Sequence, residues 1–227
     1  MKEIKIISAT KHDLVPSQNT PIRKSISKML GQVGYTIEVN NKNSLASVYN
    51  KHIIEENRDK ILIFAHDDCV IEDSFLVEKV NNALETFDVI GLAGIKSPIT
   101  IKEPCLWHLL GERQNMSGAV AHFAKASTYN GEDRFMTSFG VTPARVILLD
   151  GVFLAINTAK ALDVGLRFDE SNPAKFHFYD LHLSLDANRL GLKLGTWPIW
   201  ASHKSSGLEH VTQDWLDGQK YFINRWS

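Results

Sequence analysis

The chain has 227 residues, of which 44% are hydrophobic and 22% are charged. This composition is typical of a folded globular protein and excludes an intrinsically disordered chain. The 25 basic residues are balanced by 26 acidic residues, for a formal net charge of -1. A dedicated nucleic-acid-binding protein would carry a basic excess, so no nucleic-acid partner is expected.

The cysteines and the start of the sequence favour a cytoplasmic location. Cys69 and Cys105 are too few for a disulfide framework or a cysteine-built zinc site. After Met1 the sequence alternates charged and apolar residues, unlike a signal peptide. Every apolar run is far shorter than the ~20 residues of a membrane span. We therefore expect a soluble protein of a reducing compartment, whose contact with membranes is at most peripheral.

Predicted strands and helices alternate through the first half of the chain. Strands are expected at residues 4–9, 35–39, 61–65 and 89–93, and helices at 21–33, 45–53 and 75–87. The strand at 61–65 is uncharged throughout, as expected when both faces of a strand are covered. This alternation predicts a Rossmann-like, three-layer α/β/α sandwich with a mainly parallel central sheet. Ligands of such sheets bind at the carboxyl ends of the strands.

The second half of the chain is less regular. Residues 96–145 show no clear helical or strand period, so this segment is interpreted as irregular. Such a segment is usually a functional loop or an element that the pattern does not reveal. Beyond it, a long strand is predicted over 146–156, a helix over 179–190 and a final strand over 193–201. Pro198 favours an edge position or a bulge in the final strand. The aromatic residues between Trp215 and Trp226 are expected to pack against the domain.

Two adjacent carboxylates, Asp67 and Asp68, follow the strand at 61–65 and His66. Adjacent carboxylates repel each other unless a cation or hydrogen-bond donors neutralise them. Their oxygens suit a hard divalent ion, Mg²⁺ or Mn²⁺, that bridges to phosphates. Alternatively, these acids favour the start of the next helix, although Asp73 is better placed to cap it.

Three later positions have both a functional and a structural interpretation. Asp150 interrupts an apolar strand, and Gly151 would let a ligand or another backbone approach; a β-bulge with a satisfied carboxylate is the alternative. Asp180 begins a predicted helix, whose dipole keeps a carboxylate ionised as a general base requires, but helix capping also explains it. His203 either completes a metal site, which would favour Mn²⁺ over Mg²⁺, or is an ordinary surface or core histidine.

The order of these segments along the chain resembles that of one enzyme family. The segments are Ser44-Leu45-Ala46, Tyr49-Asn50, Ile61 to Asp68, Leu149 to Ile156, Phe168-Asp169-Glu170, Phe176 to Leu185, Trp197 to His203 and Trp215 to Trp226. Together they resemble the inverting family-2-type glycosyltransferases of the GT-A fold. The small bacterial branch with a His-Asp-Asp variant of the Asp-x-Asp motif looks most similar. The resemblance implies a single GT-A-like domain over 1–227, with a nucleotide-binding half at 1–95 and an acceptor-side half at 96–227.

The resemblance implies a role for each candidate residue on the donor side. Asp68 would bind a Mn²⁺ or Mg²⁺ ion on the donor diphosphate, and His203 would contact the metal or a phosphate. Asp67 or His66 would lie near the ribose. The residues that would hold the nucleoside are Ser8, Thr10, Asn40 and Asn41. The sequence departs from the family where many relatives place an aspartate after the second strand, which leaves the nucleobase undetermined.

On the acceptor side, the resemblance implies that Asp180 is the catalytic base. Asp150 and Gly151 would line the sugar and acceptor pocket, and Trp107 would cover the acceptor. His182 stands where an acidic residue is common in the family.

These roles imply that a sugar moves from a UDP-, GDP- or TDP-linked donor to an acceptor hydroxyl, with inversion and with the help of a metal ion. The acceptor would be a glycan, a lipid-linked intermediate or a small molecule. A non-catalytic nucleotide- or sugar-binding protein on the same fold is the main alternative. A metal-dependent phosphoesterase and a nucleotidyltransferase are further alternatives. The last is disfavoured because residues 8–16 lack the glycine-rich loop that would hold a triphosphate.

Overall fold

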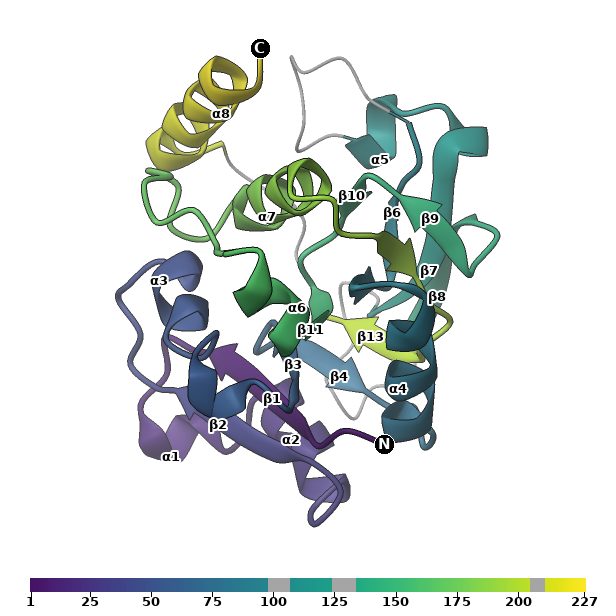
Figure 1. Cartoon of the computed structure of the whole chain (residues 1–227). Coiled ribbons are helices and arrows are strands. Elements are labelled where there is room, and N and C mark those ends of the chain that lie inside the picture. The colour runs from purple at the N-terminus through teal and green to yellow at the C-terminus, as the bar shows by residue number, and fades with distance from the viewer. Residues whose placement is uncertain (98–106, 124–133, 205–210) are drawn as a thin grey trace.

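The computed structural model describes residues 1–97, 107–123, 134–204 and 211–227. A seven-stranded sheet in the order β2-β1-β3-β11-β5-β12-β9 forms its centre (Figure 1). The strands of this sheet are β1 (Ile4–Ala9), β2 (Gly34–Glu38), β3 (Ile61–Ala65), β5 (Val89–Gly91), β9 (Ala144–Val146), β11 (Phe153–Asn157) and β12 (Leu194–Thr196).

This central sheet is mixed, whereas the sequence predicted a mainly parallel one. β1 pairs in parallel with β2 and β3, and β5 with β12, as the alternation of strands and helices predicts. β11 lies between β3 and β5 and runs antiparallel to both, with Phe153 beside Ala65. Because β11 runs the other way, its first residues lie at the edge where β3 ends. The preceding Asp150-Gly151 turn is therefore brought to the edge at which ligands of such sheets bind.

Helices cover both faces of this sheet. α2 (Pro21–Lys28) and α4 (Leu76–Thr86) pack on one face, while α3 (Leu45–Asn50), α6 (Thr158–Asp163) and α7 (Tyr179–Arg189) cover the other. Successive residues of a strand point to opposite faces. Ile61 and Ile63 of β3 accordingly join the first core, and Leu62 and Phe64 join the second. This double burial explains why β3 carries no charge.

A second, smaller sheet has the order β10-β6-β7-β13-β4, with β8 paired to β7. Its strands are β4 (Cys69–Ile71), β6 (Ala93–Ile95), β7 (Met116–Phe123), β8 (Arg134–Gly140), β10 (Leu148–Leu149) and β13 (Ala201–His203). The prediction that 96–145 is irregular is therefore wrong for its described residues, which include β7 and β8. β7 is buried on both faces and β8 is largely exposed, so neither shows the alternation of a half-buried strand.

The two long strands predicted in the second half are each divided in the structure. Residues 146–156 contribute to β9, β10 and β11, of which β10 belongs to the smaller sheet. Residues 193–201 contribute to β12 and to the start of β13, with Pro198 between them. In both places the chain passes from one sheet to the other.

Short helical elements complete the described structure: α1 (Leu14–Ser17), α5 (Trp107–Leu110), and the 3-10 helices η1 (Glu55–Asn57) and η3 (Arg113–Asn115). None of the helices in the described ranges combines the length and apolar character that crossing a bilayer requires.

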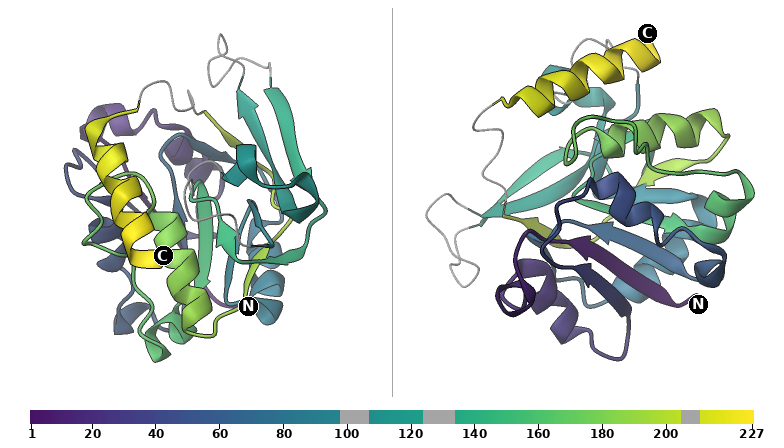
Figure 2. Two further views of the ribbon diagram at one scale, coloured as in Figure 1. Left: turned by 90° about the horizontal axis from the view of Figure 1, so that it is seen from above. Right: turned by 90° about the vertical axis from the view of Figure 1, so that its left-hand side faces the viewer.

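The C-terminal helix α8 (Gln213–Trp226) packs against α7 (Figures 1 and 2). Trp226 donates its indole N–H to Nδ1 of the buried His182 at 3.0 Å. Trp215 and Phe222 bury Phe178, the residue before α7, which has a left-handed φ of 65°. The expected packing of the aromatic C-terminal segment is thus confirmed, and it holds the start of α7 in place.

Candidate active site

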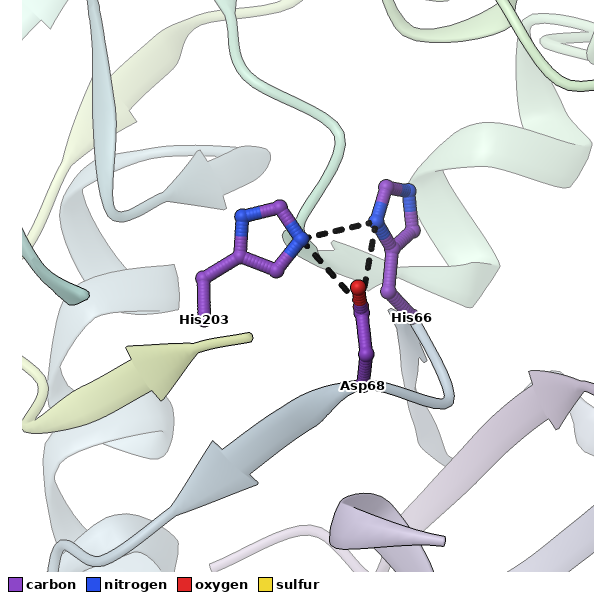
Figure 3. Close-up of side chains that lie close together, drawn as sticks. All are labelled: His66, Asp68 and His203. Carbon is purple, nitrogen blue, oxygen red and sulfur yellow. Dashed lines mark hydrogen bonds and ion pairs between the residues drawn. The ribbon is translucent and has the colours of Figure 1, made fainter. Parts of the chain in front are cut away.

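Three side chains from two segments of the chain meet near the carboxyl end of β3. His66 and Asp68 belong to the turn between β3 and β4. β13 pairs antiparallel with β4, and this register places His203 opposite Cys69, next to Asp68. Nδ1 of His66 lies 3.4 Å from Nε2 of His203, and Oδ1 of Asp68 lies 3.2 Å from that same Nε2. Figure 3 shows the three side chains pointing toward one another.

Burial and mutual contact set the ionisation of this cluster. Burial and the neighbouring His203 lower the pKa of His66, so its ring is neutral at pH 7. Burial opposes the charged forms of Asp68 and His203, but their contact outweighs it. The contact lowers the pKa of Asp68 and raises the pKa of His203.

The cluster fits a divalent metal ion. Its three ligand atoms all lie within 4.8 Å of one another. Oδ1 of Asp68 is buried, and it lies 3.2 Å from Nε2 of His203 and 3.8 Å from Nδ1 of His66. Two imidazole nitrogens and one carboxylate suit Mn²⁺ better than Mg²⁺, which prefers oxygen ligands. The structure therefore brings Asp68 and His203 together as expected, and it adds His66, one of the two residues that were expected near the ribose.

Tyr179 is a residue of this site that no sequence pattern predicted. Its hydroxyl lies 2.7 Å from Nε2 of His66 and 2.9 Å from the carbonyl oxygen of Gly151. The side chain is buried, in contact with Tyr49 and Phe168. A buried tyrosine usually finds a partner for its hydroxyl, but nothing in the sequence indicates that the partner is a histidine 113 positions away.

Asp180, the next residue of α7, also contacts Gly151. Its Oδ2 accepts the backbone N–H of Gly151 at 2.8 Å. Burial and the nearby Asp150 raise the pKa of Asp180 to about 7. The sequence predicted that the helix dipole keeps this carboxylate ionised, but burial outweighs that effect. A general base works best when its pKa is close to the pH of the reaction, so the environment of Asp180 still suits the role of base.

Gly151 is buried beneath the first turn of α7. A Cβ atom at this position would lie 2.3 Å from the hydroxyl oxygen of Tyr179 and 2.9 Å from Cβ of Asp180. The close approach expected at Gly151 is therefore made by a helix, and glycine is the residue that permits it. Asp150, the preceding residue, accepts the N–H of Val152 at 3.0 Å and is thus satisfied within the turn.

The residues expected to bind the nucleoside lie at the ends of β1 and β2. The N–H of Asn41 donates to the carbonyl of Thr10 at 2.9 Å, which joins the two strand ends. Oγ of Ser8 is buried and has no hydrogen-bond partner within the described ranges. Asn40 is exposed with a positive φ of 49°, and Asp67 lies between His66 and Asp68. Their contacts with a nucleotide stay a prediction.

Trp107 is a buried residue. It is only 3% exposed and belongs to the larger hydrophobic core. Its ring packs against Phe139 at a centroid distance of 5.4 Å. This burial does not fit the role of covering an acceptor, and we assign Trp107 to the core.

Comparisons with known proteins agree with this architecture. A model of a glycosyltransferase-like family matches residues 20–225, and no curated protein matches the sequence significantly. Among solved structures, the chain resembles the mannosyltransferase PcManGT from Pyrobaculum calidifontis in complex with GDP-Man and Mn²⁺. The TM-score is 0.52 and the identity 10%, over 92% of this chain and 58% of that one.

The chain also resembles GalNAc-T7 in complex with UDP, GalNAc and Mn²⁺. Here the TM-score is 0.55 and the identity 10%, over 100% of this chain and 48% of that one. At these identities the likeness shows the fold alone, which is the GT-A fold of glycosyltransferases. The chain spans about half the length of the two proteins.

Proposed function

The chain belongs to the glycosyltransferase-like family, and we propose that it transfers a sugar from a nucleotide-sugar donor to an acceptor hydroxyl with inversion at the anomeric carbon. The observation that carries this proposal is the cluster of His66, Asp68 and His203, which hydrogen bonds connect to a carboxylate with a pKa near neutrality. That carboxylate is Asp180, and the connection runs through Tyr179 and Gly151. The two structural neighbours, whose structures contain GDP-Man or UDP together with Mn²⁺, support a nucleotide-linked donor.

The donor would lie along the carboxyl ends of β1, β2 and β3. Ser8, Thr10, Asn40 and Asn41 would hold the nucleoside, and Asp67 would lie near its ribose. A Mn²⁺ or Mg²⁺ ion held by His66, Asp68 and His203 would neutralise the negative charge that develops on the departing diphosphate. The nucleobase in this proposal is that of UDP, GDP or TDP.

Asp180 would activate the acceptor. The acceptor oxygen attacks the anomeric carbon of the sugar and passes its proton to the carboxylate of Asp180. The bond between that carbon and the diphosphate oxygen breaks, and the electron pair leaves with the diphosphate. A single displacement of this kind inverts the anomeric centre. Asp150 lies close enough to Asp180 to raise its pKa, and it would line the same pocket.

The test is a donor and acceptor screen with two readouts. Release of nucleoside diphosphate is measured for each nucleotide sugar with simple glycan, lipid-linked and small-molecule acceptors, and the anomeric configuration of the product is read by NMR. Acceptor-dependent release with an inverted product supports the proposal. A retained configuration contradicts the single displacement. Tight binding of a nucleotide without turnover of any acceptor would instead favour a non-catalytic binding protein on this fold.

A further inference from the structure

The hydrogen bonds of Tyr179 fix the position of a proton on His66. A carbonyl oxygen can only accept a hydrogen bond, so the Tyr179 hydroxyl donates its single proton to Gly151, 2.9 Å away. The phenol oxygen must then accept the second hydrogen bond, which is its 2.7 Å contact with Nε2 of His66. The ring proton of His66 is therefore on Nε2.

This assignment determines what the other ring nitrogen can do. A neutral imidazole carries one proton, so Nδ1 of His66 keeps its lone pair. Nδ1 is also the nitrogen that faces the cluster, 3.4 Å from Nε2 of His203 and 3.8 Å from Oδ1 of Asp68. Without the bond to Tyr179, the proton could occupy Nδ1 and block this nitrogen as a ligand.

We propose that Tyr179 is a positioning residue for the metal site, which holds His66 in the tautomer and ring orientation whose Nδ1 binds a divalent cation. The inference deepens the proposed function and rests on it for the presence of the cation. Histidine ligands of metals commonly donate their other N–H to a fixed partner, and losing that partner weakens metal binding ~10- to 100-fold.

The surroundings of Tyr179 leave its hydroxyl little freedom. The ring packs against Tyr49 and Phe168 at centroid distances of 5.8 and 6.0 Å. Gly151 lies directly beneath the hydroxyl, where any Cβ would collide with it. Tyr179 precedes Asp180 in α7, so the same turn of helix that fixes His66 also carries the proposed base.

Tyr49 offers a matched control. It is as deeply buried as Tyr179 and belongs to the same aromatic cluster. Its hydroxyl has no hydrogen-bond partner among the described residues. Tyr49→Phe therefore removes a buried hydroxyl without touching His66, whereas Tyr179→Phe removes the acceptor of the His66 N–H.

The first measurement reads the tautomer in the metal-free protein. Nitrogen-15 NMR of the histidine side chains should show His66 as a single Nε2–H tautomer in wild type and in Tyr49→Phe. Tyr179→Phe should give a mixture of tautomers. An Nδ1–H tautomer in wild type, or the same signals in wild type and Tyr179→Phe, would overturn the proposal. Because wild type alone can give the first of these results, the test does not depend on the folding of a variant.

The second measurement is a titration of wild type and both variants with Mn²⁺. The concentration of free ion is measured at each step by electron paramagnetic resonance. We expect Tyr179→Phe to raise the Kd for Mn²⁺ ~10- to 100-fold and Tyr49→Phe to leave it unchanged. A folded Tyr179→Phe protein with the wild-type Kd would overturn the role of Tyr179 while the metal site stands. A wild-type protein that binds no Mn²⁺ would overturn the metal site itself, and the NMR result would still report on the Tyr179–His66 bond.

Discussion

Asp180 and Gly151 are joined by a hydrogen bond of 2.8 Å between the carboxylate and the backbone N–H, and the carbonyl of the same glycine accepts the phenol proton of Tyr179. Two consecutive residues of α7 thus bind both polar backbone groups of one residue. Because Tyr179 also contacts His66, the turn at Gly151 fixes the proposed base relative to the proposed metal ligands. The site depends on this turn as much as on the residues that would perform the chemistry.

Replacing Gly151 with alanine should therefore disturb both parts of the site. The new Cβ would lie 2.3 Å from the hydroxyl oxygen of Tyr179, so the first turn of α7 has to move. Overpacking of this kind costs about 1–3 kcal/mol, which for a chain of this size lowers the Tm by roughly 2–12 °C. Transfer activity should fall as well.

Gly34→Ala is the matched control for Gly151→Ala, measured by the same thermal unfolding. A Cβ at Gly34 would have its nearest neighbour at 3.6 Å, an ordinary van der Waals distance. Its Tm should stay close to that of wild type. Equal Tm values and activities for the two variants would show that the turn at Gly151 tolerates displacement and does not fix the site.

Asp180→Asn should abolish most of the transfer while it leaves donor binding intact. An amide cannot accept the acceptor proton, so kcat should fall by about 10²- to 10⁴-fold. The affinity for nucleoside diphosphate with Mn²⁺ should not change, because Asp180 is not among the proposed ligands. Asp163→Asn, an exposed change at the end of α6, serves as the control. Turnover near the wild-type rate in Asp180→Asn would exclude Asp180 as the base.

The raised pKa of Asp180 predicts how activity depends on pH. Burial and Asp150 raise this pKa to about 7, so the carboxyl group is protonated below that pH and cannot act as a base. The value of kcat/KM should therefore increase as the pH rises through about 7 and level off above it. A profile measured from pH 5.5 to 9 that stays flat across neutrality would contradict the assignment.

His182 should make the free energy of unfolding depend on pH in the acid range, below the pH at which Asp180 titrates. Burial lowers its pKa to about 4, below the usual value near 6.5, so the unfolded chain binds the proton more tightly. The stability that this neutral histidine contributes is present above pH 6.5 and is lost as the pH falls toward 4. The difference corresponds to at most about 3 kcal/mol.

The matching measurement is denaturant unfolding of wild type and His182→Gln between pH 4 and 7. Removing the titrating ring should flatten the decline in unfolding free energy at acid pH. The same slope in both proteins would mean that other groups cause the decline. This test also concerns the contact of α8 with α7, since Trp226 donates to Nδ1 of His182.

Much of the central sheet could be predicted from the sequence because its strands and helices carry clear local patterns. The uncharged strand at 61–65 and the helix at 75–87 correspond to β3 and α4. The antiparallel direction of β11 could not be predicted, since a buried apolar strand looks the same in either direction. β7 and β8 were missed for the related reason that burial on both faces, or exposure, removes the alternation that identifies a strand.

Individual residues of the site were easier to select than their contacts. Asp68 and His203 stand at strand ends in the sequence, and the pairing of β4 with β13 brings them together. The hydrogen bond between Tyr179 and His66 depends on how α7 lies against the turn after β10. A local sequence pattern does not predict that arrangement. For Trp107 the sequence suggested a role in the site, because it is an aromatic residue in an apparently irregular segment. In the structure it is part of the core.

The proposed transferase must bind a nucleotide through a metal ion held at Asp68. This requirement is tested by thermal unfolding of wild type and Asp68→Asn with UDP, GDP, CDP, TDP or ADP, each with and without Mn²⁺. A ligand at 100 times its Kd stabilises the folded state by about 2.7 kcal/mol, which raises the Tm by roughly 5–10 °C. We expect such a shift for wild type with one of these nucleotides, only when Mn²⁺ is present, and its loss in Asp68→Asn. No shift with any nucleotide, or a shift that is the same without Mn²⁺ and in Asp68→Asn, would contradict metal-assisted donor binding at this site.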